Sequence, residues 1–141
     1  MATARTLDTA VAALIVGYGA TRLASNLRTD IAIPAAGSTG FQLVIEHVAA
    51  DERNSNTVYK AVDVVVRFVH KLAAVTLTGE LAAWLDTLCP TFVAPLLLSS
   101  TWRGLTTTVQ EVLEGPEIDK SVERVGNVLV CSIKARIALK I

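Results

Sequence analysis

Apolar and polar positions alternate with two different periods along the chain, and each change of period marks a new element. From Thr6 to Leu27 apolar residues recur every three or four positions, which predicts an amphipathic helix. Gly17 and Gly19 fall inside this period, where each costs up to about 1 kcal/mol relative to alanine, so they indicate a bend or close packing. Thr29 to Gly40 has no period and is expected to be an extended connection.

Two strand patterns follow and predict a hairpin. Apolar and polar side chains alternate from Phe41 to Ala50 and again from Thr57 to Lys71. The polar cluster from Asp51 to Asn56 between them predicts the turn. At about 3.3 Å per residue the second strand would span about 45 Å, so we expect part of it to project beyond the core.

The second half of the chain repeats the order of helix and hairpin. Its predicted elements are a helix from Thr78 with a bent apolar continuation past Pro90, a strand from Thr106 to Glu114, a turn at Gly115–Pro116, a charged loop from Glu117 to Arg124, and a strand from Val128 to Leu139. We therefore predict a single α+β domain over residues 1–141. It would have a mainly antiparallel four-strand sheet with two main helices packed on one face, in the order helix, hairpin, helix, hairpin.

Composition adds a reason to expect partners. Hydrophobic residues make up 52% of the 141 residues and charged residues only 18%, below the roughly 25% that is usual in soluble domains. This shortage of charge predicts surface that is buried against other chains. The 13 basic residues balance the 13 acidic ones, which argues against a basic nucleic-acid-binding protein. The apolar stretches are shorter than the roughly 20 residues of a membrane helix, so we expect no membrane partner.

The imidazole groups offer little chemistry. His47 and His70 are the chain's two histidines, and both fall in strand patterns. A metal site would need them to meet across the hairpin with Glu46 or Asp51 as a third ligand. Ordinary solvated or half-buried strand histidines are the favoured interpretation. We predict no catalytic residue, no metal and no cofactor.

The two thiols are predicted to be structural. Cys89 and Cys131 lack the spacing of a metal site or of a redox motif, and both fall in apolar patterns. We expect both to be buried and reduced, as in an intracellular protein.

Charged side chains on the long strands form a second candidate surface. Asp63 and Arg67 share a face of one strand but lie about 13 Å apart along it, so each should find its partner on a neighbouring strand. Lys134 and Arg136 begin a basic stripe on the last strand. These four residues are our candidates for the wall of a channel or for a seam between subunits, and a simple solvated face is the alternative.

The order of the elements resembles that of the tail-terminator proteins of long-tailed bacteriophages, of the lambda minor-tail kind. Ser55-Asn56-Thr57 leads into the long strand through Phe68, and Leu77 to Leu85 is a capped helix. Val109 to Leu113 and, after a charged segment, Gly126 to Val130 begin the closing hairpin. The resemblance covers nearly the whole chain and depends on patterns, without signature residues.

This resemblance implies a non-enzymatic virion protein of the tail or neck, assembled in the host cytoplasm. Such proteins form a ring, typically a hexamer, that binds the last ring of tail-tube subunits and stops the tube from growing. The ring then offers a joining surface to the head–tail connector, and DNA passes transiently through it. The alternatives are a related neck, tail-completion or tail-tube assembly subunit, and a small α+β enzyme or ligand-binding domain with a pocket near His47 or His70.

In a ring of this kind the polar loops would carry the axial contacts, and the edge of a long strand such as Thr57 to Lys71 would pair between subunits. The candidate interaction surface consists of Asp51, Glu52, Arg53, Asn54, Glu117, Asp119, Lys120, Glu123 and Arg124. The alternative is that these residues form ordinary polar turns.

Overall fold

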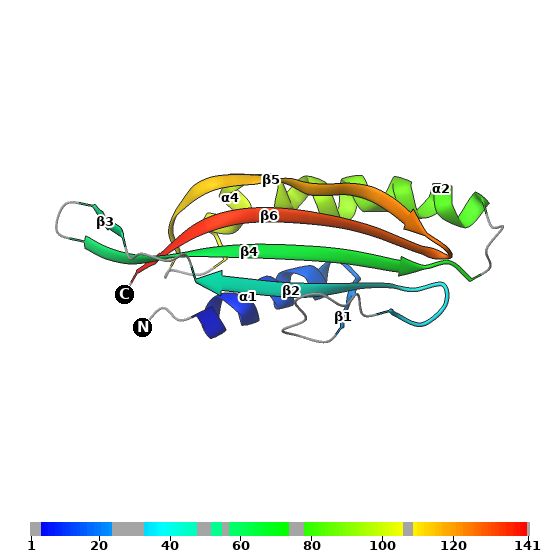
Figure 1. Cartoon of the computed structure of the whole chain (residues 1–141), viewed down its shortest axis with the longest axis horizontal. Coiled ribbons are helices and arrows are strands. Elements are labelled where there is room, and N and C mark those ends of the chain that lie inside the picture. Colours follow the sequence, from blue (N-terminus) through cyan, green and yellow to red (C-terminus); the bar gives the residue numbers. More distant parts are fainter. Residues whose placement is uncertain are drawn as a thin grey trace.

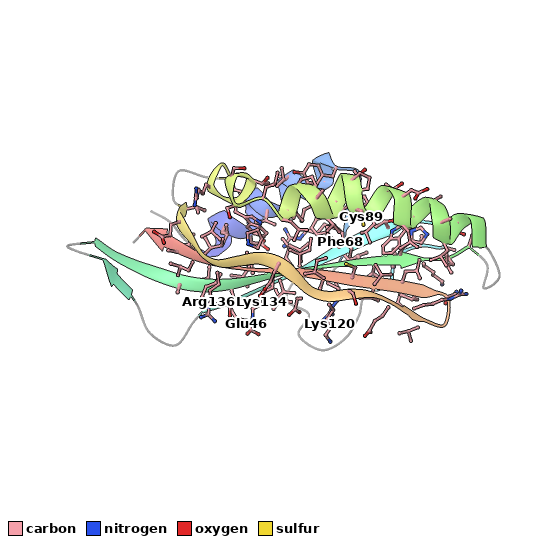
Figure 2. All side chains as sticks on the ribbon, turned by 90° about the horizontal axis from the view of Figure 1, so that it is seen from above. Glu46, Phe68, Cys89, Lys120, Lys134 and Arg136 are labelled. Atoms are coloured by element: carbon pink, nitrogen blue, oxygen red, sulfur yellow. The ribbon has the colours of Figure 1, made fainter. Side chains whose placement is uncertain are left out.

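One sheet forms the centre of the molecule, and the helices lie against one of its faces (Figure 1, Figure 2). The computed structural model describes residues 4–23, 33–47, 52–54, 57–73, 78–105 and 109–140. The elements are α1 (Ala4–Gly17), β1 (Thr21–Arg22), β2 (Thr39–His47), β3 (Glu52–Asn54), β4 (Thr57–Lys71), α2 (Thr78–Thr87), the π-helical segment η1 (Leu88–Val93), α3 (Ala94–Leu96), α4 (Ser99–Arg103), β5 (Val109–Val125) and β6 (Val128–Lys140).

The strands lie in the order β1-β2-β4-β6-β5, and β3 pairs with the first part of β4. The long neighbours are all antiparallel, whereas the two-residue β1 runs parallel to β2. The predicted α+β class and the mainly antiparallel sheet are confirmed. The predicted number of four strands is too low, because β1 and β3 have only two and three residues and leave no periodic pattern.

The core fills the space between the sheet and the helices. Alternate residues of β4, from Val62 to Phe68, point toward the helices and are buried, and β6 contributes its own alternate residues in the same way. The helical layer supplies the buried side chains Leu7, Val11, Ile15, Trp84, Leu88, Phe92, Leu96 and Trp102. Phe68 and Phe92 stack at the centre of this layer with ring centroids 5.3 Å apart. The described helices are too short or too polar to cross a bilayer.

The first helix is shorter than the sequence predicts. α1 ends at Gly17, and Gly19 adopts a φ of 101°, a left-handed conformation that glycine accepts more readily than other residues. The chain then extends into β1, where Arg22 donates to both oxygens of Asp8 at 2.9 and 2.8 Å. The two glycines therefore stop the helix instead of bending it. Residues 24–27 of the predicted helix lie outside the described residues.

The second helix continues past Pro90 as the sequence predicts. The residues at its two junctions, Thr87 and Ala94, have right-handed helical backbone angles, so α2, η1 and α3 follow one path. Leu98 is extended and separates this path from α4.

The last hairpin differs most from its prediction. β5 does not end at Glu114: it runs for 17 residues, through Gly115–Pro116, to Val125. Gly115 has a φ of 73°, and a Cβ atom there would lie 2.9 Å from the carbonyl oxygen of Lys134. The pairing of β5 with β6 shifts register here and at four other places, so the glycine sits in one of several irregularities of a continuing strand. The turn is at Gly126–Asn127, and residues 117–124 are strand, not loop.

A two-stranded arm extends beyond one end of the sheet. β3 pairs with Thr57 to Tyr59, whereas β6 first meets β4 at Tyr59, which faces Lys140. The start of β4 therefore projects together with β3 (Figure 1), which confirms the expectation that the long strand leaves the core. The predicted turn over residues 51–56 is replaced at 52–54 by β3, and Asp51, Ser55 and Asn56 lie outside the described residues.

Candidate functional site

Three rows of side chains cross the strands on the face of the sheet opposite the helices, which we call the polar face. In order from β2 to β5, the rows are Glu46, Asp63, Arg136 and Glu114; then Val44, Val65, Lys134 and Glu117; then Gln42, Arg67, Ser132 and Lys120. Figure 2 shows Glu46, Lys120, Lys134 and Arg136 on this side of the sheet and Phe68 and Cys89 on the other. The four residues predicted to line a channel or seam are therefore brought together on one face.

The first row contains a bidentate ion pair between β4 and β6. Arg136 Nε donates to Asp63 Oδ1 at 2.8 Å, and Arg136 Nη2 donates to Asp63 Oδ2 at 3.2 Å. Lys134 Nζ lies 4.0 Å from the same carboxylate, and Glu114 Oε1 lies 3.6 Å from Arg136 Nη1. The hydrogen bond from Arg136 lowers the pKa of Asp63, so this carboxylate stays ionised well into acid.

The other rows surround a shallow hollow of about 220 Å³. Arg67 Nη1 donates to Gln42 Oε1 on β2 at 3.4 Å. Glu46, Asp63, Arg67, Lys120 and Lys134 all line this hollow, so both signs of charge are present within a small area. The prediction that Asp63 and Arg67 have partners on neighbouring strands is confirmed, with Asp63 bonded to β6 and Arg67 to β2.

The irregular pairing of β5 gives this strand an unusual period. The residues that face the polar side of β6 recur at every third position: Glu111, Glu114, Glu117, Lys120 and Glu123 stand opposite Ala138, Arg136, Lys134, Ser132 and Val130. A regular strand would turn every second residue to the same face. β5 thereby sets acidic side chains against the basic residues of β6, an arrangement that stabilises antiparallel pairs.

β5 is also the edge of the sheet. Its outer side pairs with none of the described strands, and three apolar side chains of β5 are exposed: Ile118 by 49%, Val122 by 37% and Val125 by 62%. β4 lies between β2 and β6 from Val62 to His70, so the expected pairing between subunits through the edge of Thr57 to Lys71 is wrong. Among the described strands, the longest available edge belongs to β5, and the outer edge of β2 is open beyond Phe41.

The predicted interaction residues form two separate sets, one in the arm and one along β5. Glu52, Arg53 and Asn54 form β3 in the projecting arm, beside the end of β6. Glu117, Asp119, Lys120, Glu123 and Arg124 are exposed on β5, and the last of them lies near the start of β6. Glu117, the member of this set nearest the arm, stands opposite Lys134, about 20 Å along β6 from Lys140 at the rise of a strand, so the structure does not join the two sets into one surface.

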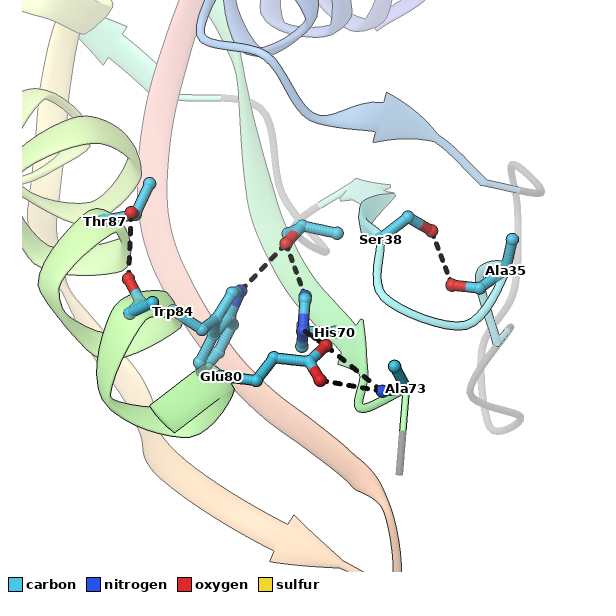
Figure 3. A network of polar contacts seen from close by, with 9 residues as sticks. Ala35, Ser38, His70, Ala73, Glu80, Trp84 and Thr87 are labelled. Atoms are coloured by element: carbon cyan, nitrogen blue, oxygen red, sulfur yellow. Dashed lines mark hydrogen bonds and ion pairs between the residues drawn. The ribbon is translucent and has the colours of Figure 1, made fainter. Parts of the chain in front are cut away.

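A pocket of about 530 Å³ lies at the end of the sheet opposite the arm, between the start of β2, the end of β4, the α1–β1 junction and α2. A chain of hydrogen bonds crosses it (Figure 3). Trp84 Nε1 donates to Thr39 Oγ1 at 2.9 Å, Thr39 Oγ1 lies 2.8 Å from His70 Nδ1, and His70 Nε2 lies 3.0 Å from Glu80 Oε1. We call these four residues the relay.

The carboxylate of Glu80 determines which atoms of the relay donate hydrogen bonds and which accept them. Both of its oxygens accept from the Ala73 backbone N–H, at 3.1 and 2.9 Å, and this bond, followed by the contact with His70, lowers the pKa of Glu80. An ionised carboxylate only accepts, so His70 Nε2 carries a hydrogen. In neutral His70 the hydroxyl of Thr39 then donates to Nδ1 while it accepts from Trp84, and each polar group is satisfied.

The relay has the order hydroxyl, imidazole, carboxylate that also occurs in nucleophilic triads. A triad needs backbone amides that can stabilise an oxyanion. Two amides of the pocket wall are already bonded, with Gly37 N–H donating to the Lys71 carbonyl at 2.7 Å and Ser38 N–H to the Ala35 carbonyl at 3.0 Å. The contacts of the relay are instead those of a structural link that attaches α2 to the sheet.

Comparison with known proteins gives a limited result. The chain matches no protein-family model and no curated protein. Among solved structures, it is similar to a chain of the virion of a native gene transfer agent particle, with 16% sequence identity and a TM-score of 0.44 over 95% of this chain and 91% of that chain. A likeness of this size does not assign a function.

The histidines do not form a metal site. His47 pairs with Val62 and His70 pairs with Thr39, at opposite ends of the β2–β4 ladder and about 26 Å apart at the rise of a strand. The hypothesis that His47 and His70 bind one metal ion together is therefore wrong. In the described part of the chain, no group of three or more His, Cys, Asp or Glu residues is arranged to hold a metal ion.

The thiols differ from each other. Cys131 is buried as predicted, and burial raises the pKa of its thiol to about 11. Cys89 is exposed, contrary to its prediction. Leu88 and Phe92 turn toward the core, so the residue directly after Leu88 points away from the sheet. Both thiols are free.

Sequence reasoning missed the relay, although it singled out His70. Glu80 and Trp84 are four residues apart on α2 and share a helix face, which is a visible signal. Thr39 gives no such signal, because its role depends on β2 pairing in register with β4, where Thr39 stands opposite His70.

Proposed function

We propose that this chain is a structural subunit of a phage-like tail, which forms a ring, caps the tail tube and stops its growth. The observation that carries the proposal is the outer edge of β5, a long edge strand with three exposed apolar side chains. Edges of this kind are sites of pairing with another chain unless they are covered. The apolar excess and the low fraction of charged residues support burial against partners.

The directions of the strands favour a head-to-tail ring. β2, β4, β6 and β5 alternate in direction across the sheet. A copy rotated about an axis along the strands would place its β2 beside β5 with opposite direction, so the antiparallel pattern would continue from subunit to subunit. β1 covers the outer edge of β2 only at Gly40 and Phe41. Head-to-tail contacts close into a ring when the rotation from one subunit to the next is a whole fraction of a full turn. The resemblance to tail terminators suggests six subunits.

In such a ring the polar face would line the channel, and the helices would lie outside. The rows of the polar face would then become rings of charge in which Asp63 and Arg136 neutralise each other. A wall of mixed sign holds passing DNA less strongly than a basic wall, because release of counterions from phosphates requires uncompensated positive charge. This supports transient passage of DNA without tight binding.

The two ends of the sheet would give the ring two unlike surfaces. The arm of β3 and β4 projects at one end, and the Gly126–Asn127 turn and the pocket with the relay lie at the other. A terminator needs this asymmetry, since one surface must bind the tube and the other the head–tail connector. The same features support a related neck or tail-completion subunit, which would form rings but would not bind tube ends.

A small enzyme or ligand-binding domain is the second candidate, and the observation that favours it is the pocket beside His70. In that case the chain should be a monomer or dimer, and His70→Asn should abolish an activity. In a terminator the same substitution should leave assembly nearly intact, provided that the variant folds.

Light scattering and negative-stain imaging of the purified chain, alone and with tail tubes, test the proposal. Rings alone or at tube ends are the expected result. Ile118→Lys and Val122→Lys should prevent ring formation by placing charge on the β5 edge. Val16→Lys is the matched control, because Val16 is 53% exposed on α1, outside the sheet. The proposal fails if the unmodified chain forms no rings in either setting, or if all three variants assemble equally.

A further inference from the structure

α2 is attached to the rest of the molecule by very little apolar contact. Among its residues 79–87, Trp84 is the one buried side chain, and Leu81 is partly buried. The segments that follow are different, because η1 and α3 bury Leu88, Phe92, Val93 and Leu96. A helix with a single buried side chain gains little from the hydrophobic effect, so other contacts must hold it.

Those other contacts converge on one point of the sheet. Trp84 and Glu80, four residues apart on α2, reach Thr39 at the start of β2 and His70 at the end of β4. Glu80 also accepts from the backbone of Ala73, just after β4. The rings of His70 and Trp84 stack with centroids 5.6 Å apart, so the apolar and polar contacts of the helix share the same site (Figure 3).

From this arrangement we infer that α2 is a detachable helix, and that the relay of Trp84, Thr39, His70 and Glu80 is its latch. When the latch opens, the helix leaves the sheet as a unit, which removes one wall of the pocket of about 530 Å³ and exposes its sheet side. The sheet, α1 and the segments from Leu88 onward stay folded, because Trp84 is the one buried side chain that residues 79–87 add to their core. Local opening of this kind has its own free energy, below that of global unfolding.

Loss of one member of the relay should open the latch without unfolding the core. Glu80→Gln removes the charge that accepts from Ala73 and His70, and Trp84→Phe removes the indole N–H while it keeps an aromatic ring. Thr39→Val removes the hydroxyl in the middle of the relay. Thr87→Ala is a matched control, because Thr87 lines the same pocket but donates only to the Ala83 carbonyl within the helical path.

Amide hydrogen exchange at residues 79–87, measured by mass spectrometry or NMR, tests the inference. We expect exchange to rise at least tenfold in Glu80→Gln and Trp84→Phe, to stay unchanged in Thr87→Ala, and to remain slow in β4 and β6 of every variant. The inference is overturned if α2 exchanges at the unmodified rate in both variants, or if β4 and β6 speed up in step with it.

The two indole N–H groups give a second measurement in the unmodified protein. Trp84 donates into the latch, whereas Trp102 donates to the Leu96 carbonyl at 2.7 Å in the core. If the latch opens locally, exchange of the Trp84 indole proton should follow α2, while that of Trp102 follows β4 and β6. Equal rates for both indoles would overturn the inference. It goes beyond the proposed function and stands or fails independently of ring formation.

Discussion

Asp63 and Arg136 stand directly opposite each other on β4 and β6, and two nitrogens of the guanidinium bind the two oxygens of the carboxylate. The pair lies between Glu46 on β2 and Glu114 on β5. Arg136 is therefore the one basic residue in a row with three carboxylates, and its removal would leave Asp63 with the more distant Lys134 Nζ, 4.0 Å away.

Arg136→Gln should lower the free energy of unfolding at neutral pH by the small amount expected of a solvent-screened pair. The pKa of Asp63 is held below its ordinary value, so the contribution of the pair is complete above about pH 4 and is lost as the pH falls through the lowered pKa. Urea unfolding from pH 7 to pH 2 should show the two proteins converging in acid. A difference that is constant with pH would contradict this account.

Gly115→Ala should destabilise the protein by about 1–3 kcal/mol. The new Cβ atom would lie 2.9 Å from the Lys134 carbonyl oxygen, and the φ of 73° is unfavourable for alanine. Gly79→Ala is the control, since a Cβ atom at this position in α2 would have no neighbour within 4 Å, and alanine favours helix there. Thermal unfolding should separate the two variants clearly, and similar melting temperatures would contradict the strand geometry at Gly115.

Only Cys89 should react with a thiol reagent in the folded protein at pH 8. Cys131 is buried, and its pKa of about 11 leaves almost no thiolate at that pH. A colorimetric thiol assay should count one thiol per chain in buffer and two in denaturant. Cys89→Ser should abolish the reaction in buffer, and a rapid reaction of that variant would show that Cys131 is accessible.

The latch of α2 should weaken in acid. The pKa of Glu80 is lowered, so the stabilisation it provides is complete above its ordinary pKa and is lost as the pH falls through the lowered value. His70 on β4 and Tyr18 beyond α1 are the other titratable groups lining the pocket. His70 Nε2 donates to Glu80 in either protonation state of the imidazole, and burial raises the pKa of Tyr18 away from this range.

The measurement compares α2 opening in the unmodified protein and in Glu80→Gln across the acid range, after correction for the intrinsic pH dependence of exchange. The two opening free energies should differ near neutral pH and converge below about pH 4. A difference that stays constant across the acid range would contradict the role of the Glu80 carboxylate.

The sequence predicts the regular parts of this fold and misses the parts that depend on tertiary partners. The alternation from Thr57 to Lys71 is sufficient to place β4 and to assign Asp63 and Arg67 partners on neighbouring strands, because side-chain direction in a regular strand follows from position alone. Gly115–Pro116 has the composition of a turn, and only its close approach to Lys134 and Ala135 on β6, within a shift of register, reveals a strand irregularity. Gly19 similarly ends α1 where composition alone indicates a bend.

The candidate surfaces divide in the same way. Asp63, Arg67, Lys134 and Arg136 could be grouped from the sequence, because they occupy alternating positions of two strands that pair in register. The relay could not be predicted from the sequence. Thr39, His70 and Glu80 come from three elements, and they meet only because β2 pairs in register with β4 and α2 packs beside them.

The irregular edge of β5 also bears on how the unassembled chain avoids indiscriminate association. A flat strand with a period of two can accept a neighbour in many offsets, and this freedom leads to fibres. β5 shifts register five times along its length, so its hydrogen-bonding groups are not evenly spaced. A partner strand must match that spacing, and few sequences or offsets will do so. In the proposed ring, these irregularities would therefore restrict the exposed edge to a neighbouring strand of matching spacing and would disfavour aggregation through it.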